Sequence, residues 1–302
     1  MKLKVIFASL RAPFFTGTVV PVILGSILAW HHGFPFEWGL FWLTLLGAVA
    51  LHAGANTIND YFDHLSGNDP VNREFVRPFS GGSRLIQNGE LTARGMLKIS
   101  LVCYLLGIAI GLVLTYLRGM AVFWIGLTGV ACGVFYVAPG IHLVRRGLGE
   151  LAIALAFGVC CVTGAYYVQA QRFGLEVFWA SLPVALLITA VLWINEFPDF
   201  NADREVGKNH WVVRLGRKRA AWGYGLIMLT TYLLILGLSV FFNKVWLLLG
   251  LLTAPVAFAS VRNALKNYDN IPALVPSNAG TIITHLLTGL LLATGYLLQT
   301  II

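Results

Sequence analysis

The sequence predicts an all-α integral membrane protein with nine transmembrane helices in a single domain that covers residues 1–302. Of these residues, 58% are hydrophobic and only 11% are charged, whereas charged residues make up roughly a quarter of a typical soluble domain. The apolar residues fall in runs close to the length of about 20 residues that a helix needs to cross a bilayer. Such runs are too long for the strands of a membrane barrel. We place them at residues 14–31, 37–58, 95–117, 121–138, 150–170, 177–195, 220–241, 245–261 and 279–301.

The first run is expected to remain as a transmembrane helix. Arg11 interrupts the apolar stretch near the N-terminus before it is long enough for a signal peptide, so no cleaved signal is predicted. With nine spans, 18 of the 21 Lys and Arg residues, Lys2 among them, fall on the side of the N-terminus, and only Arg118, Arg172 and Lys244 fall on the other. Because cytoplasmic loops carry the excess of Lys and Arg, we predict a multi-pass protein of the cell membrane with a cytoplasmic N-terminus and an outer C-terminus.

The net charge of +8 follows from this topology, so no nucleic-acid partner is predicted, and no obligate protein partner is evident. Eleven of the thirteen acidic residues lie on the same cytoplasmic side, although acidic residues contribute little to orientation. Ionisable groups at membrane depth are costly and are usually functional. We therefore expect the active-site loops on the cytoplasmic face.

The first of two aspartate-rich motifs, NTINDYFDHLSGND, lies at the cytoplasmic end of the second run. Asn56, Asp60 and Asp63 are spaced at i, i+4 and i+7, so they share one face of a helix. Asp69 follows across a glycine-containing turn and is the weaker candidate, because a loop separates it from the helix.

The second motif, INEFPDFNADREVGKNH, lies at the end of the sixth run. Asn195, Asp199 and Asp203 share a helix face provided that the helix continues past Pro198. Its NEFPD segment resembles the NDYFD of the first motif and follows it by 136 residues. This likeness predicts two four-helix halves and one additional helix, because internal repeats are common in membrane proteins.

The chemistry of the two motifs points to a cation and a phosphate. Carboxylates on one face repel each other unless a cation joins them, and Mg²⁺ usually takes one or two carboxylates together with substrate oxygens. Gly81-Gly82 would let the backbone approach a ligand closely. A diphosphate site with Mg²⁺ next to an apolar membrane cavity predicts an isoprenyl diphosphate as the substrate. Basic residues suited to phosphate follow both motifs: Arg73, Arg77, Arg84, Arg204 and Lys208.

These motifs resemble the UbiA superfamily of intramembrane aromatic prenyltransferases over essentially the whole chain. The resemblance rests on NDYFDHLSGND (59–69), RPFSGG (77–82), YVAP (136–139), GLGE (147–150) and DFNADREVGK (199–208) followed by VVRLG (212–216). GGSRLIQNG (81–89) and TGAYYVQ (163–169) are most similar to the dihydroxynaphthoate polyprenyltransferases of menaquinone biosynthesis. The NEFPD form, with Glu196 and Pro198, differs from the asparagine-rich motif of that branch, so the aromatic acceptor stays open.

The resemblance implies nine transmembrane helices around a central cavity, with two Mg²⁺ ions holding the diphosphate between the motifs. One ion would be held by the first motif and one by the second, under a cap of cytoplasmic loops. The implied site residues are Asp60, Asp63, Asp199 and Asp203 as catalytic metal ligands, Asn56 and Asn195 beside them, Arg73, Arg77, Arg204 and Lys208 on the diphosphate, and Arg11 and Tyr136 near the substrates.

The predicted reaction transfers a polyprenyl group to an aromatic acceptor, and branch similarity favours 1,4-dihydroxy-2-naphthoate. Mg²⁺ and the basic residues stabilise the negative charge that builds on the departing diphosphate. The electron-rich ring then attacks the allylic cation, and a dry cavity protects that cation from water. Other acceptors stay open: 4-hydroxybenzoate, a glyceryl phosphate, a chlorin or haem. A secondary transporter is the alternative from another class, but its ionisable residues would lie near the bilayer midplane.

Overall fold

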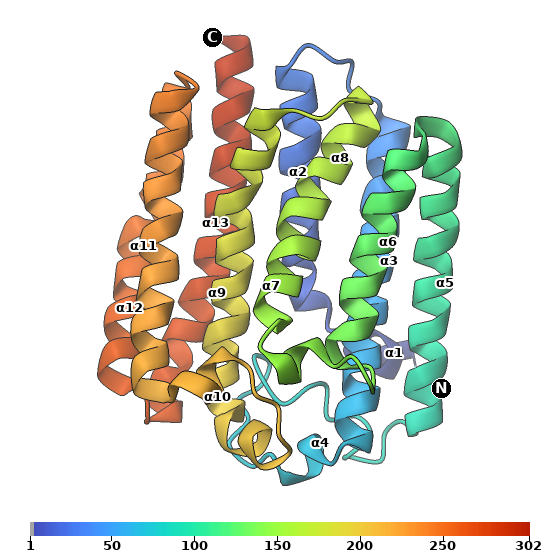
Figure 1. Cartoon of the computed structure of the whole chain (residues 1–302), viewed down its shortest axis with the longest axis vertical. Coiled ribbons are helices and arrows are strands. Elements are labelled where there is room, and N and C mark those ends of the chain that lie inside the picture. Colours follow the sequence, from blue (N-terminus) through green and yellow to red (C-terminus); the bar gives the residue numbers. More distant parts are fainter. Residues whose placement is uncertain (1–2) are drawn as a thin grey trace.

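The structure, a computed structural model, describes residues 3–302, and over that range the chain forms helices and no strand. Lys2, one of the basic residues counted above, lies outside the described residues. The helices form an elongated bundle with the N-terminal helix at one end and the C-terminus at the other (Figure 1). In chain order they are α1 (Leu3–Ser9), η1 (Ala12–Phe15), α2 (Thr16–His31), α3 (Trp38–Leu65), α4 (Asn68–Val71), α5 (Ala93–Arg118), α6 (Met120–Val137), η2 (Leu143–Arg146), α7 (Gly149–Ile153), η3 (Ala154–Cys160), α8 (Cys161–Ala170), α9 (Leu175–Glu205), α10 (Trp211–Leu215), α11 (Arg217–Phe241), η4 (Val245–Thr253), α12 (Ala254–Asn267) and α13 (Ile271–Ile301).

The long helices confirm the predicted all-α membrane fold. Among the described residues, eight helical segments are long and apolar enough to cross a membrane, and they correspond to eight of the predicted runs. The remaining run, 121–138, corresponds to α6, whose apolar stretch Met120–Phe135 is shorter than the others. Helix α6 packs against α3 and α5 and runs alongside them (Figure 1). Eight of the nine predicted spans are thus long enough to cross a membrane, and the remaining run forms a shorter apolar helix beside them.

Helix α9 continues through Pro198, as the alignment of the second motif on one face requires. Proline has no N–H and leaves the carbonyl four residues earlier, that of Ile194, without its helical donor. The side chain of Asn278 in α13 supplies that donor, because its Nδ2 lies 3.1 Å from the Ile194 carbonyl oxygen. The same amide nitrogen donates to Asn195 Oδ1 at 2.8 Å. Helix α13 therefore supports α9 at the position where the motif begins.

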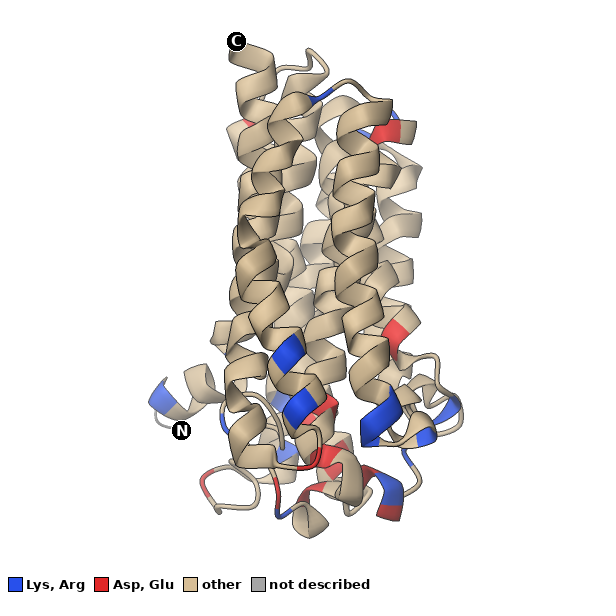
Figure 2. Cartoon of the chain, turned by 90° about the vertical axis from the view of Figure 1, so that its left-hand side faces the viewer, with Lys and Arg blue, Asp and Glu red and all other residues tan. Residues whose placement is uncertain are grey.

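The charged residues gather at one end of the bundle, where α3 and α9 end (Figure 2). The short helices α4 and α10 lie at the same end (Figure 1). The segment between α3 and α5 folds back over this end and reaches the first motif. At Gly82, φ is +67° and an added Cβ would lie 2.8 Å from Asp60 Oδ1. Glycine is required there because it tolerates this backbone conformation and leaves room for the carboxylate.

A cavity of about 350 Å³ runs inside the bundle from the charged end. Its walls come from α2, α3, α5, α6, α7 to α9 and from the loops at the charged end. No described residue of α11, α12 or α13 lines it, since α11 and α13 pack against the far side of α9, and α12 packs on both of them. The expected central cavity is therefore enclosed by the helices of the first six predicted spans.

Candidate active site

The first motif lies at the charged end of α3, with both of its aspartates buried. The side chain of Asp60 points toward the folded-back segment and that of Asp63 toward Lys208, and the two residues are only 2% and 9% exposed. Asp60 Oδ2 accepts a hydrogen bond of 3.0 Å from the backbone N–H of Ser83. Its Oδ1 lies 3.7 Å from the guanidinium of Arg11. The Arg11 side chain, which precedes the first membrane helix, thus reaches the motif in the second.

The second motif faces the first across the cavity, and both of its aspartates are bound by amides from the opposing loop. Asn72 Nδ2 donates to Asp199 at 2.6 Å, and the backbone N–H of Gly81 donates to it at 3.3 Å. Asn68 Nδ2 donates to Asp203 at 2.9 Å. The segment after the first motif therefore holds the carboxylates of the second, although more than 120 residues separate them in sequence.

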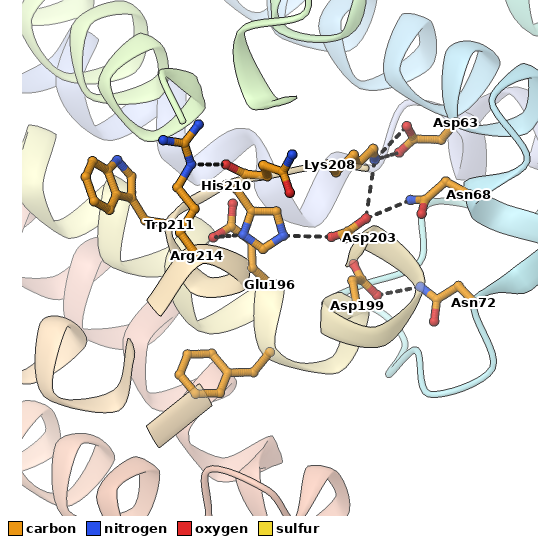
Figure 3. Close-up of polar contacts among 12 residues, drawn as sticks. Asp63, Asn68, Asn72, Glu196, Asp199, Asp203, Lys208, His210, Trp211 and Arg214 are labelled. Carbon is orange, nitrogen blue, oxygen red and sulfur yellow. Dashed lines mark hydrogen bonds and ion pairs between the residues drawn. The ribbon is translucent and has the colours of Figure 1, made fainter. Parts of the chain in front are cut away.

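Lys208 joins the two motifs directly (Figure 3). Its Nζ lies 2.7 Å from Asp63 and 3.6 Å from Asp203. Burial alone lowers the pKa of Lys208, but the neighbouring carboxylates of Asp63 and Asp203 outweigh burial and raise it above its ordinary value. The ammonium therefore stays charged and bridges carboxylates that would otherwise repel each other.

Negative charge still exceeds positive charge at this end of the cavity. Asp69 lies near the two motif-one aspartates, and it is buried rather than set apart by a flexible loop. Burial, together with the charges of Asp63 and Asp60, raises its pKa to about 8. Gln87 donates to its carboxylate at 2.9 Å and the Arg84 guanidinium donates to its backbone carbonyl at 2.5 Å. Burial and the neighbouring carboxylates therefore both disfavour the ionised form of Asp69.

The donor atoms at the site fit a hard divalent cation. Among the described residues, the buried oxygens Asp60 Oδ1, Asn68 Oδ1 and Asn72 Oδ1 have no hydrogen-bond partner. Carboxylate and amide oxygens are the ligands that Mg²⁺ and Ca²⁺ take, and Mg²⁺ keeps coordination positions for water or phosphate. Unpaired buried oxygens are unfavourable, so a cation would satisfy both the charge and the missing bonds.

A histidine and two glutamates lie directly beside the aspartates. His210 Nε2 lies 3.0 Å from Asp203 Oδ2, and its Nδ1 lies 3.3 Å from Glu196 Oε2 (Figure 3). Glu150 Oε1 accepts a hydrogen bond of 2.7 Å from the Trp211 N–H. Burial lowers the pKa of His210, but the Glu196 and Asp203 carboxylates outweigh burial and raise it to about 10. No role was predicted for His210, because the loop after α9 removes any helical spacing that would relate it to Asp203.

The predicted site residues divide into those that line the cavity and those that do not. Asp60 lies immediately behind the Gly82 backbone, which lines the cavity. Arg84 stacks over Phe75, and Arg73, Arg77 and Arg204 are exposed outside the cavity wall. Phosphate binding by these four arginines stays a prediction. The predicted residues that do line the cavity are Arg11, Asn56, Asp63, Tyr136, Asn195, Asp199, Asp203 and Lys208.

The two motif asparagines make structural hydrogen bonds. Asn56 Nδ2 donates to the Leu10 carbonyl at 3.1 Å and so ties the N-terminal segment to α3. Asn195 Oδ1 accepts from Asn278. Asn68 and Asn72, which the sequence analysis did not single out, contact the second motif instead. Their only sequence signal is their place at the end of the first motif and just after it.

The chain is similar to known proteins in both sequence and structure. The model of the UbiA prenyltransferase family matches residues 18–275. The chain is 30% identical to the 1,4-dihydroxy-2-naphthoate octaprenyltransferase of Escherichia coli, covering 96% of this chain and 94% of that protein. It is 29% identical to the 2-carboxy-1,4-naphthoquinone phytyltransferase of Synechocystis, with coverage of 97% and 93%.

Solved structures show the same fold. A UbiA homolog from Archaeoglobus fulgidus bound to GPP and Mg²⁺ aligns with a TM-score of 0.63 at 15% identity, covering 95% of this chain and 99% of that one. The apo structure of a UbiA homolog from Aeropyrum pernix aligns with a TM-score of 0.68 at 16% identity, covering 93% and 97%. The matched family model and these relatives show that the chain belongs to the UbiA prenyltransferase family.

Proposed function

We propose that this chain transfers a polyprenyl group from an isoprenyl diphosphate to 1,4-dihydroxy-2-naphthoate, with Mg²⁺ assisting the departure of the diphosphate. One observation carries the proposal: two aspartate motifs meet at the charged end of a cavity that continues between apolar helices. Such a cavity suits a substrate with a charged head and an apolar tail. The activities named for the E. coli and Synechocystis relatives support a naphthalene-type acceptor over 4-hydroxybenzoate, a glyceryl phosphate, a chlorin or haem.

The oxygens at the charged end would hold Mg²⁺, with Asp60 and Asp63 on one side and Asp199 and Asp203 on the other. When bound, the metal supplies positive charge that stabilises the leaving diphosphate. Lys208 already lies between the two motifs and can donate to a phosphate oxygen as a point charge. Arg11 lines the same end of the cavity.

The deeper walls of the cavity keep water away from the reacting carbon. Leu51, Leu114, Val122, Ile125 and Val168 line it beyond the motifs. An allylic cation formed in a water-excluded cavity is protected from hydrolysis until the acceptor ring attacks it. The residues of this chain therefore bind the diphosphate at one end and shield the prenyl chain at the other.

The proposal is tested by incubating the purified protein with a labelled prenyl diphosphate and a panel of acceptors, and by identifying products by mass. We expect prenylation of 1,4-dihydroxy-2-naphthoate, loss of turnover in EDTA, and recovery when Mg²⁺ is added. Transfer only to another acceptor on the panel would overturn the acceptor assignment. Full turnover in metal-free buffer would overturn the role of the metal.

A further inference from the structure

A carboxylate without a donor stands in the wall of the cavity beside the second motif. Glu196 is 6% exposed and lines the cavity. Its Oε1 has no hydrogen-bond partner among the described residues. Its Oε2 lies 3.3 Å from His210 Nδ1, which is longer than a well-formed hydrogen bond. Leaving a buried acceptor without a donor is unfavourable, so a ligand in the cavity is the natural source of that donor.

The neighbours of Glu196 hold its carboxylate in place and leave one oxygen free. The His210 ring lies between Glu196 and Asp203, with one ring nitrogen directed at each carboxylate (Figure 3). His210 Nε2 is therefore bonded to Asp203, and the longer Nδ1 contact places the ring beside the Glu196 carboxylate. Glu150 does not line the cavity, and one of its oxygens already accepts from the Trp211 N–H. Glu196 is thus the carboxylate of this cluster that faces the cavity.

The charge of the cluster selects the kind of group that can bind there. Two buried carboxylates, Glu196 and Glu150, lie within 4.8 Å of the same histidine. An anionic group would be repelled by them, whereas a neutral hydroxyl would donate to the free oxygen. Tyr136 lines the same cavity, and its ring packs against Gly149, at the start of the short helix that carries Glu150. The position therefore combines an aromatic surface with a hydrogen-bond acceptor.

Resting on the proposed function, we propose that Glu196 binds a ring hydroxyl of the aromatic acceptor and takes the proton of that hydroxyl as the new carbon–carbon bond forms. The ligand class is a neutral hydroxyarene group, separate from the diphosphate at the aspartates. His210 is a positioning residue, because its two ring nitrogens are directed at Glu196 and Asp203.

In the proposed step, the bond between C1 of the prenyl group and the diphosphate oxygen breaks, and its electron pair leaves with the diphosphate. A ring carbon of the acceptor bonds to C1. The hydroxyl proton moves to the Glu196 carboxylate, so the acceptor is left as a neutral ketone. Loss of the hydrogen on the new ring carbon and return of a proton to oxygen restore the aromatic ring. A general base of this kind contributes typically about 10²- to 10⁴-fold.

The test pairs the change Glu196→Gln with acceptors in which one ring hydroxyl is methylated. We expect the variant to lose about 100-fold or more in the rate of prenyl transfer, with its KM for the prenyl diphosphate and its Mg²⁺ dependence unchanged. In the unaltered protein, methylating the hydroxyl bound by Glu196 should cause a comparable loss. In the variant, the same methyl group should cost little, since the interaction is already gone.

Two matched variants separate proton acceptance from charge and folding. Glu150→Gln removes the same charge from the same cluster but leaves the cavity wall intact, so it should keep transfer within a few-fold. Glu196→Asp keeps a carboxylate and should retain more activity than Glu196→Gln. The inference is overturned if Glu196→Gln transfers at the normal rate, or if Glu150→Gln loses as much transfer rate as Glu196→Gln. It is also overturned if the unaltered protein prenylates both methyl ethers as fast as the free hydroxyarene. Failure of the unaltered protein to prenylate any acceptor would instead overturn the proposed function itself.

Discussion

The four motif aspartates have different partners, and the partners decide how each position tolerates substitution. Within the part of the chain that the structure describes, Asp199 accepts hydrogen bonds only from neutral groups, the Asn72 amide and the Gly81 N–H. Asp63 and Asp203 instead share the Lys208 ammonium. Removing one partner of a buried ion pair costs about 3–5 kcal/mol, because a charge is left uncompensated. Asp199 is therefore the position at which loss of a ligand is best separated from loss of folding.

We predict that Asp199→Ala lowers prenyl transfer by at least about 100-fold, the scale expected when one stabiliser of transition-state charge is removed. The protein should remain folded, because only neutral donors lose their partner. Transfer is measured with purified protein, and folding by size-exclusion chromatography and thermal melting. Glu37→Ala is the control, since Glu37 precedes α3 at the end opposite the first motif, pairs with Arg118 and should not affect transfer. Near-normal transfer by a folded Asp199→Ala protein would show that the second motif does not act on the diphosphate.

Helical spacing was enough to predict which motif residues share a face, but not which loop residues meet them. Asp60 and Asp63 lie together because a helix repeats every 3.6 residues. Asn68, at the start of the short helix α4, and His210, in the loop after α9, are brought to Asp203 by chain turns that no periodic pattern in the sequence predicts. The departure of Glu196 from the expected second motif is visible in the sequence, but its partner His210 becomes evident only in three dimensions.

Helix α9 shows how one element depends on another for its continuity. Pro198 removes the N–H that would bond the Ile194 carbonyl, and Asn278 of α13 replaces it with a side-chain donor. The same side chain orients Asn195 at the start of the motif. A substitution in α13, which does not line the cavity, is thus expected to act on a helix that does.

We predict that Asn278→Leu lowers the free energy of unfolding by about 1–3 kcal/mol, because two buried acceptors lose their donor. In a Pro198→Ala background the same change should cost less by about 1 kcal/mol, since the substituted alanine restores the helical N–H to the Ile194 carbonyl. Both costs are measured by denaturant or thermal unfolding in detergent. Equal costs in the two backgrounds would show that Asn278 does not compensate for the proline.

The hydropathy runs predicted the membrane-spanning portions of the helices correctly, but they did not predict where the helices end. The runs 37–58 and 177–195 correspond to helices Trp38–Leu65 and Leu175–Glu205, which continue past the apolar residues at the charged end. Hydropathy marks where a helix crosses hydrocarbon, whereas a helix continues as long as its backbone hydrogen bonds are satisfied. The motif aspartates lie in these extensions, so the least predictable part of each helix carries the chemistry.

At the scale of the molecule, the bundle has one charged end and one nearly uncharged end (Figure 2). We propose that the charged end is cytoplasmic, because Lys and Arg are concentrated there. In a variant whose four cysteines are replaced by alanine, a cysteine at the exposed position Asn209 should react with an impermeant thiol reagent only in inverted vesicles. A cysteine at Phe173, exposed at the other end, should react in intact cells. The opposite pattern at these two positions would reverse the orientation.

The enclosure of the cavity by only part of the bundle could not be predicted from the sequence. All nine runs have similar composition, and hydropathy contains no information about which helices touch. The structure places α11 and α13 behind α9, so the last three predicted spans support the cavity from outside. The likeness of the two motifs was the one sequence feature that anticipated their meeting at one end of the cavity.

The position of Lys208 has a consequence for how the protein is made. Its tethered ammonium already occupies the gap between Asp63 and Asp203, so it serves as a resident counter-ion before any divalent cation arrives. The chain does not need to capture a metal in order to bring its two halves together, unlike small metal-dependent domains whose folding waits for the ion. Under the proposed function, assembly in the bilayer and binding of the cation would be separate events.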